Sequence, residues 1–165
     1  MSLNMPSLRS ILLGFAAMSS ASLAKEKLQV VWSSGHFSTI AGPNGGNEFG
    51  HDSGFAITND KGQSYFDSAY PADHAPCYNT GDGREFKVMS SCWKEPRSFK
   101  CKSNFGGNPE SCEVFDSVGN SLAKGKGNTD TKFIGIALTQ SSSCGVNFEL
   151  EADEHCDDKA EWRIV

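Results

Sequence analysis

The stretch FAITNDKGQSYF, from Phe55 to Phe66, shows most directly how this chain folds. Two runs of residues that favour strands, Phe55–Thr58 and Gln63–Phe66, flank the four polar residues Asn59–Gly62. A short polar link that ends in glycine is typical of a β-hairpin, because glycine readily adopts the positive φ that such turns require. The stretch therefore predicts two antiparallel strands joined by a tight turn.

The same arrangement recurs downstream, where Glu113–Phe115 and Ser121–Ala123 flank Asp116–Asn120. Further strand-like runs are Leu28–Trp32, Arg84–Met89, Lys132–Leu138, Val146–Leu150 and Trp162–Val165. The most apolar of them is Lys132–Leu138, which we expect to be a central strand. Only Glu151–Ala160 could form a helix, and it lacks the apolar stripe that would anchor one. Many short strands with regular turn signals predict an all-β fold, an antiparallel β-sandwich or barrel.

Composition narrows the classes of protein to which the chain can belong. It has 165 residues, of which 38% are hydrophobic, and a formal net charge of −5. This length suits one domain with a sizeable core. The acidic balance tells against binding nucleic acid by neutralising many phosphates, so no nucleic-acid partner is expected. No repeat or linker divides the chain, and we expect a monomer.

The first 24 residues have the layout of a secretory signal peptide. A single cation precedes the apolar run Ile11–Met18, and Ser22 and Ala24 are the small residues of a cleavage site. The apolar run is far shorter than the roughly 20 residues that span a bilayer, so no membrane anchor is expected. The sequence thus predicts a signal peptide, residues 1–24, followed by one secreted, extracellular β-rich domain, residues 25–165.

All six cysteines follow the predicted signal peptide: Cys77, Cys92, Cys101, Cys112, Cys144 and Cys156. An even number of cysteines in a secreted chain predicts disulfides, here three of them, that staple the β domain. Their spacing is too wide for a zinc site, which favours Cys-x-x-Cys pairs. The connectivity is one of about 15 possibilities. Pairing of neighbours (Cys77–Cys92, Cys101–Cys112 and Cys144–Cys156) would suit adjacent antiparallel strands.

No nucleophile, metal-binding or phosphate-binding motif occurs at the spacing that its chemistry requires, so no catalytic residue, metal or cofactor is assigned. His51 and His74 have acidic neighbours, in His51-Asp52 and Asp73-His74, but both pairs are expected in polar loops. A small secreted ribonuclease is the enzymatic alternative, with acid–base groups that act on a phosphodiester. Residues of the required types are His36, Glu48, His74 and Arg84.

Trp93 and Arg97 are the candidate binding residues, because a tryptophan and an arginine on a proline-containing loop have the composition of a binding hot spot. The alternative is that Trp93 packs on the disulfide of the neighbouring Cys92. Trp32 and Trp162 lie in alternating strands and are expected in the core. Gly42–Gly50 is expected to be a long polar loop, and the loops expected to carry contacts are Gly42–Gly54, Trp93–Arg97 and Ser103–Ser111.

The signal peptide, the six cysteines and the turns rich in Asn, Gly and Ser together resemble the small secreted cysteine-rich proteins of filamentous fungi, which include effectors and cell-death elicitors. The stretch from Cys112 to Cys144 has the character of this class. The resemblance implies a non-enzymatic protein that binds a host target and modulates host immunity or cell death, and it assigns no functional residue. The expected partner is a host protein or a cell-wall glycan. The alternative functions are a cell-wall polysaccharide-binding module and the ribonuclease.

Overall fold

The computed structural model describes residues 25–39, 48–69, 77, 84–134 and 137–165, so the predicted signal peptide lies outside the described part of the chain. Within these ranges the chain forms antiparallel strands and no helix, and hence no helix long or apolar enough to cross a membrane. The strands are β1 (Lys27–Thr39), β2 (Glu48–Asn59), β3 (Ser64–Ala69), β4 (Arg84–Ser90), β5 (Arg97–Ser103), β6 (Pro109–Phe115), β7 (Ser121–Ile134), β8 (Ala137–Glu149) and β9 (Trp162–Ile164). The predicted all-β antiparallel fold is confirmed.

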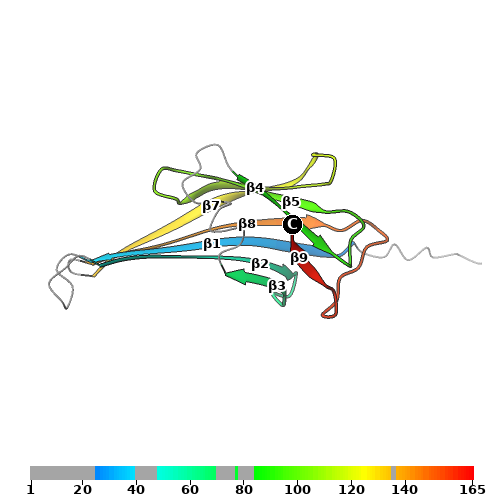
Figure 1. Ribbon diagram of the computed structural model, residues 1–165, viewed down its shortest axis with the longest axis horizontal. Helices are drawn as coiled ribbons and strands as arrows, with labels where there is room; N and C mark the ends of the chain where they lie inside the picture. The colour runs from blue at the N-terminus through cyan, green and yellow to red at the C-terminus, as the bar shows by residue number, and fades with distance from the viewer. Residues whose placement is uncertain (1–24, 40–47, 70–76, 78–83, 135–136) are drawn as a thin grey trace, which may run out of the picture.

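The strands form one sheet in the order β3-β2-β1-β8-β7-β6-β5-β4-β9. This sheet curls into a nearly closed, barrel-like shape, in which β4, β5 and β7 lie above β1 and β2 in Figure 1. Its two edge strands meet through aromatic rings and not through a backbone ladder. The ring centroids of Tyr65 and Phe66 on β3 lie 6.5 and 6.2 Å from that of Trp162 on β9. Aromatic packing thus brings the two edges of the sheet together.

Both predicted hairpins are confirmed, and their turns use the same two devices. In the turn between β2 and β3, the side-chain oxygen of Asn59 accepts hydrogen bonds from two backbone N–H groups, at 3.0 and 2.9 Å. In the turn between β6 and β7, Asp116 accepts two such bonds at 3.0 and 2.7 Å. Gly62 and Gly119 complete the turns with φ of 78° and 91°, a region that disfavours other residues.

β7 joins the layer that contains β1, β2 and β8 to the layer that contains β4, β5 and β6. Its first half pairs with β6, whereas from Gly127 onward it pairs with β8. At the change of partner, a Cβ on Gly125 would overlap the carbonyl oxygen of Gly145 on β8, and one on Gly127 would overlap that of Pro109 on β6. The backbones of β6 and β8 can therefore approach across β7 only because neither glycine carries a side chain.

The expectation that Lys132–Leu138 forms one central strand is wrong. β7 ends at Ile134 and β8 begins at Ala137, and these two residues pair in an antiparallel ladder. The run therefore spans the reversal between two strands. Phe133 is 76% exposed, so this part of the run adds little to the core. A short apolar run cannot by its composition distinguish a buried strand from the meeting point of two strands.

One other local expectation also needs correction. Residues 48–50 of the predicted polar loop Gly42–Gly50 belong to β2, which begins at Glu48; residues 42–47 lie outside the described part of the chain. Residues 151–160 form turns and irregular backbone, not a helix. This segment has no apolar stripe, so a helix there would have had no face to bury.

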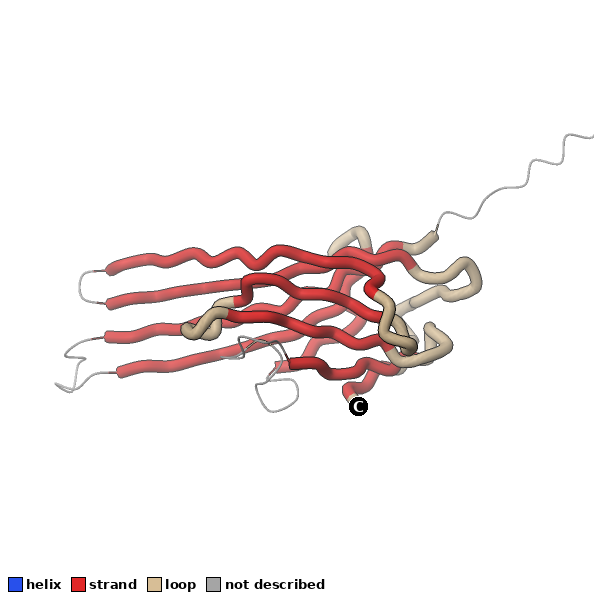
Figure 2. Tube along the Cα trace, turned by 90° about the horizontal axis from the view of Figure 1, so that it is seen from above, coloured by secondary structure: helices blue, strands red, loops and turns tan. Residues whose placement is uncertain are grey.

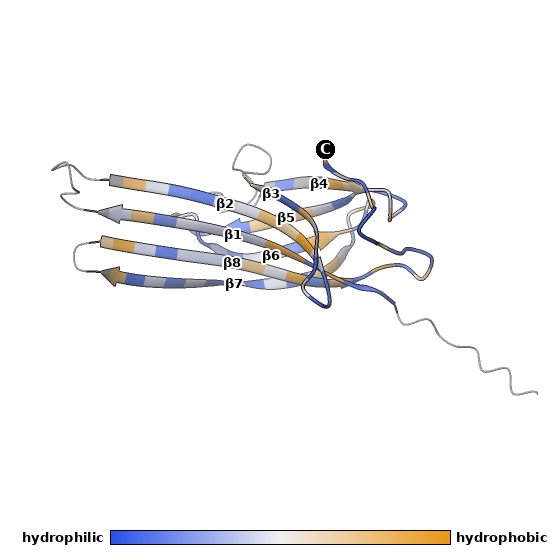
Figure 3. Cartoon of the chain, turned by 90° about the horizontal axis from the view of Figure 1, so that it is seen from below, coloured by the Kyte–Doolittle hydropathy of each residue, from blue (hydrophilic) through white to orange (hydrophobic). Residues whose placement is uncertain are grey.

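The core lies where the two layers overlap; in Figure 3 the strands there carry hydrophobic colour, which also appears at the far ends of β2, β7 and β8. Its largest fully buried side chains are Leu28, Trp32, Ile57, Phe99, Val146 and Leu150. The expected burial of Trp32 is confirmed. Trp162 is only half-buried, because it lies on the edge strand β9.

The three predicted disulfides are present, but the expected pairing of neighbours is wrong for all of them. The bonds join Cys77 to Cys101, Cys92 to Cys156 and Cys112 to Cys144. Cys101 and Cys112 do face each other on β5 and β6. Cβ atoms of directly opposed residues lie about 4.5–5.5 Å apart, however, which is wider than the roughly 3.8 Å that a disulfide favours. Cys112 instead bonds to Cys144 on β8, across the point where β7 changes partner.

We expect non-reducing peptide mapping of the purified protein to recover the pairs Cys77–Cys101, Cys92–Cys156 and Cys112–Cys144. The bridges close loops with sequence separations of 24, 64 and 32 residues. Bridges over loops of this length contribute about 3–4 kcal/mol each through the unfolded state, so mild reduction should lower the melting temperature sharply. Recovery of a Cys101–Cys112 peptide would contradict the layered arrangement.

Replacing Gly127 with alanine should destabilise the fold, because the added Cβ overlaps the Pro109 backbone and β6 must move away. Overpacking of this kind costs about 3 kcal/mol, which lowers the melting temperature by roughly 10 °C. Gly106→Ala is the matched control, since a Cβ there comes no closer than 3.4 Å to the Asn104 side chain. Thermal unfolding followed by circular dichroism compares the two; equal stability of the two variants would show that the approach of β6 and β8 is not tight.

Candidate functional site

β1, β2, β7 and β8 continue beyond the core as a four-stranded ribbon that extends past the other strands (Figures 1 and 2). Within the ribbon the order is β2-β1-β8-β7. Side chains alternate along each strand, so every row of four paired residues points to one face. We call the face that carries the buried Trp32 and Cys144 the inner face, and the opposite one the outer face.

An open groove of about 480 Å³ lies on the outer face of the ribbon. Two rows of paired residues cross it from β2 to β7, first Gly54, Ser33, Ser143 and Asn128, then Asp52, Gly35, Ser141 and Asp130. Phe37 and Thr139 of the next row close one end. Small residues occupy β1 and β8 in the middle, and longer polar side chains flank them, so the face is hollowed along its centre.

Two glycines let neighbouring side chains lie flat on the outer face. A Cβ on Gly35 would collide with the carboxylate of Asp52, and one on Gly50 would collide with the ring of Phe37. The Asp52 carboxylate therefore lies over β1 in the floor of the groove, and the Phe37 ring lies over β2. Because Phe37 is 48% exposed, it offers part of an aromatic face to a ligand in the groove.

Most residues that line the groove are polar, and two of them, Asp52 and Asp130, are acidic. Its serine hydroxyls can donate and accept hydrogen bonds, whereas the carboxylates of Asp52 and Asp130 can only accept them when ionised. The residues that line the groove include no lysine or arginine. Lys132 pairs with one of the two acids, and its Nζ lies 3.5 Å from the Asp130 carboxylate. This chemistry suits a neutral ligand rich in hydroxyl groups better than a phosphate-bearing one.

On the inner face, a chain of hydrogen bonds links the ribbon to the second layer. The hydroxyls of Ser34 and Ser142 lie 3.0 Å apart, and Ser142 donates to Asn108 at 2.9 Å. Asn108, in the turn between β5 and β6, donates to Gln140 at 2.8 Å, and Gln140 donates to Thr131 at 2.9 Å. Buried polar groups that are paired in this way fix one arrangement of the strands.

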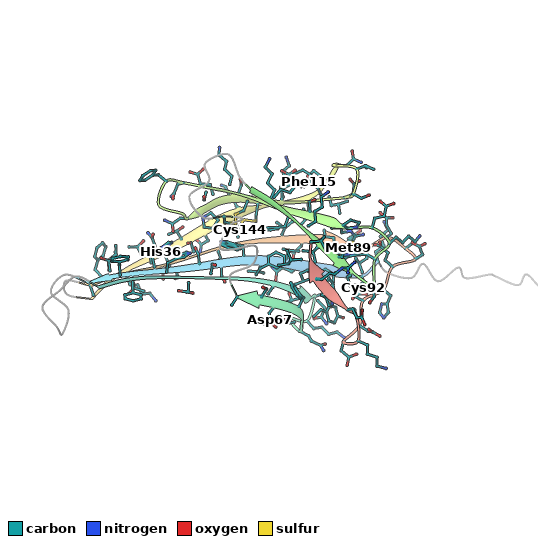
Figure 4. All side chains as sticks on the ribbon, in the orientation of Figure 1. His36, Asp67, Met89, Cys92, Phe115 and Cys144 are labelled. Atoms are coloured by element: carbon teal, nitrogen blue, oxygen red, sulfur yellow. A yellow bond between two sulfur atoms is a disulfide. The ribbon has the colours of Figure 1, made fainter. Side chains whose placement is uncertain are left out.

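His36 and His51 are direct cross-strand neighbours on the inner face, with Nδ1 atoms 3.2 Å apart. Burial lowers the pKa of His36, the neighbouring His51 lowers it further, and Asp52 opposes both effects. Figure 4 shows His36 on the ribbon, between its tip and Cys144. The expected placement of His51-Asp52 in a polar loop is wrong, because both residues lie within β2. His74 lies outside the described residues.

The ribonuclease candidates within the described residues, His36, Glu48 and Arg84, belong to three different strands. His36 lies within β1, whereas Arg84 is the first residue of β4, where it pairs with Cys101 on β5. Glu48 begins β2, opposite Thr39. Among the described residues, no cluster of three or more His, Cys, Asp or Glu side chains is placed to hold a metal ion.

The two candidate binding residues are both buried, Trp93 with 5% of its surface exposed and Arg97 with 8%. The Arg97 guanidinium lies 4.8 Å from the centre of the Trp93 ring and 5.2 Å from that of Phe148. The Trp93 ring also packs edge-on against Trp162, with centroids 4.9 Å apart. Trp93 and Arg97 therefore belong to the interior that joins the two edges of the sheet, and neither presents a surface to a partner.

Arg97 pairs with Glu154, and both side chains are more than nine-tenths buried. The Glu154 carboxylate also accepts hydrogen bonds from the backbone N–H groups of Glu151 and Lys94, at 3.0 and 3.2 Å. Burial alone would raise the pKa of Glu154, but these bonds and Arg97 together hold it below its ordinary value. The pair ties the connection between β4 and β5 to the segment that follows β8, beside the Cys92–Cys156 disulfide.

The remaining candidate loops are shorter than expected. Within Ser103–Ser111 only residues 104–108 lie between strands, and there the Asn104 side chain accepts the Asn108 N–H at 3.1 Å. In Gly42–Gly54, residues 48–54 belong to β2. The groove was missed because its residues come from four strands. The one signal for it is the pairing of two serine-rich runs, Ser33-Ser34 and Ser141-Ser142-Ser143, which face each other on β1 and β8.

Comparison with protein-family models, with curated proteins and with solved structures finds no match to this chain. Any function must therefore be argued from the groove and the other features of the chain itself.

We expect Glu154→Gln to remove a pH-dependent part of the stability. The pKa of Glu154 is lower in the folded state than in the unfolded state, where it is about 4.3. The ionised carboxylate therefore stabilises the fold above this unfolded pKa, and the stabilisation is lost as the pH falls through the lower folded pKa. The urea midpoint of the wild type should therefore fall more steeply than that of the variant between about pH 5 and pH 3.

At neutral pH the same variant should be less stable by about 3–5 kcal/mol, because it leaves the Arg97 charge buried without its counterion. Asp153→Asn is the control, since the ion pair of Asp153 with Lys94 is exposed and should contribute little. Parallel pH profiles for wild type and Glu154→Gln would argue against the buried pair.

Proposed function

We propose that this protein is a secreted, non-catalytic recognition protein that binds a neutral glycan chain along the groove on the outer face. The observation that carries the proposal is the exposed Phe37 ring beside the Asp52 carboxylate and the serine hydroxyls of the groove. A sugar ring has an apolar C–H face and a rim of hydroxyl groups. An aromatic ring packs against the former, and carboxylates and hydroxyls hydrogen-bond to the latter.

The exposure of the acidic groups supports binding over hydrolysis. Glycoside hydrolysis requires a carboxylic acid that stays protonated near neutral pH, which proteins achieve by burying it in an apolar pocket. Asp52 and Asp130 are both exposed to solvent on the outer face. Exposed carboxylates of this kind can orient sugar hydroxyls, but they lack the apolar surroundings on which a general acid of this type depends.

Secretion is supported by two independent features. The first 24 residues have the order of charge, apolar run and small residues that signal peptides share. All six cysteines are paired in three disulfides, which persist in oxidising compartments and are compatible with an extracellular protein.

A second candidate function, binding of a host protein in the manner of an effector, is favoured by the tip of the ribbon. One row of the inner face there holds Phe49, Ser38, Leu138 and Phe133. Phe49 is 86% exposed and Phe133 76% exposed. Neighbouring exposed apolar side chains of this size are typical of contacts between proteins.

We expect the mature protein to bind one class of neutral polysaccharide on a panel of glucans, xylans and chitin oligomers. Phe37→Ala and Asp52→Asn should each weaken this binding about tenfold or more, which corresponds to a loss of about 1.4 kcal/mol. Both side chains lie on the exposed face, so the melting temperature should change little. Phe105→Ala is the matched control, because Phe105 is exposed and lies outside the groove.

Other outcomes would redirect the assignment. Binding of a host protein that is lost in Phe49→Ala and Phe133→Ala, with no polysaccharide bound, would favour the second candidate. Release of reducing sugar or degradation of RNA by the purified protein would restore an enzymatic role. Glycan binding that survives both Phe37→Ala and Asp52→Asn would place the binding surface elsewhere.

A further inference from the structure

We propose that His36 and His51 together form a binding site for a divalent transition-metal ion of the Cu²⁺ and Zn²⁺ class. The site lies on the inner face of the ribbon, opposite the groove, so the proposal does not depend on the glycan-binding function.

The two imidazole rings converge at their Nδ1 atoms. The antiparallel register pairs His36 on β1 directly with His51 on β2. Their ring centroids are 4.5 Å apart and their planes differ by 32°, whereas the Nδ1 atoms are only 3.2 Å apart. The nitrogens are thus closer than the ring centres. Two rings stacked face to face would instead keep the same separation throughout.

The separation of the nitrogens matches that of two ligands on one ion. Imidazole nitrogens at about 2.0–2.1 Å from a tetrahedral ion lie about 3.3–3.4 Å from each other. The observed 3.2 Å falls within the tolerance of about 0.2 Å per bond that a preformed site allows. An ion can therefore enter with only a small adjustment of the two side chains.

Both rings are suited to coordination by their chemistry. Imidazole nitrogen is a preferred ligand of copper and zinc, and it binds them in the neutral form. Burial and the neighbouring His51 lower the pKa of His36, which favours the neutral form of that ring. In the metal-free pair one Nδ1–H donates to the other Nδ1. On coordination this proton moves to Nε2 of the same ring, so both Nδ1 lone pairs become available without a net loss of protons.

The surrounding strands hold the pair in place. Gln140 faces His36 from β8, and its side chain is held on one side by Asn108 and on the other by Thr131. This network fixes the spacing of the strands at the row that carries the histidines. With two protein ligands, water completes the coordination, so binding should be weaker than at structural zinc sites with four protein ligands.

The test is titration of the folded, disulfide-intact protein with CuCl₂ in a buffer that does not chelate copper, followed by electron paramagnetic resonance. We expect one Cu²⁺ per chain, with hyperfine splitting from two nitrogens. His36→Asn and His51→Asn should each weaken binding at least about tenfold, since loss even of a group that only supports a ligand costs about 10–100-fold. ZnCl₂ should raise the melting temperature of the wild type but not of either variant.

His155→Asn is the matched control, because His155 is exposed and lies 2.8 Å from the Glu26 carboxylate, away from the ribbon. The affinity of the His155→Asn variant for Cu²⁺ should stay within about twofold of that of the wild type, because this substitution removes no proposed ligand. Unchanged affinity in both ribbon variants, or an equal loss in His155→Asn, would overturn the proposal. Where a ribbon variant fails to fold, the nitrogen count in the wild type decides: two nitrogens support the site, and one or none refutes it.

Discussion

The backbones of β6 and β8 approach each other across β7 so closely that Gly125 and Gly127 have no room for a side chain. This approach lets β7 leave one layer and enter the other, and it brings Cys112 within bonding distance of Cys144. The barrel-like closure, the core between the layers and the free extension of the ribbon all depend on this crossing.

Polarity changes row by row along the inner face as the ribbon leaves the second layer. The row of Trp32 belongs to the core, the row of Ser34 is polar but hydrogen-bonded, the row of His36 is half-buried, and the tip carries the exposed Phe49. Among the described residues of the ribbon, β1 and β8 have a partner strand on each side. The ladders of β2 with β3 and of β7 with β6 end at Gly54 and Lys126, so beyond these residues β2 and β7 form the edges of the ribbon.

The sequence predicted the parts of this structure that are local. Asn59 and Gly62 specify their turn by themselves, and so do Asp116 and Gly119, because the hydrogen bonds and the positive φ involve only neighbouring residues. The disulfide pairing could not be predicted, since Cys112 reaches a cysteine on a strand that is not its neighbour.

The groove and the histidine pair were out of reach of the sequence for a related reason. They exist only once the register of β1 against β2 and β8 is known, and a shift of one residue would turn Asp52 to the inner face and His51 to the outer one. Trp93 and Arg97 had the composition of a binding site, yet composition does not reveal whether a loop is exposed or covered. Here Phe148 and Glu154 cover it.

The stabilising contacts and the proposed binding surface therefore lie at different ends of the molecule. The buried pair of Arg97 and Glu154, the aromatic contacts of Trp162 and the Cys92–Cys156 disulfide join the edges of the sheet at the end that holds the core. The ribbon contributes mainly serine, threonine and glycine, whose burial adds little hydrophobic free energy. Substitutions on the outer face of the ribbon, at Ser33 or Ser141 for example, can then alter a binding surface while the closure at the other end stays intact, which is the property that a scaffold for recognition requires.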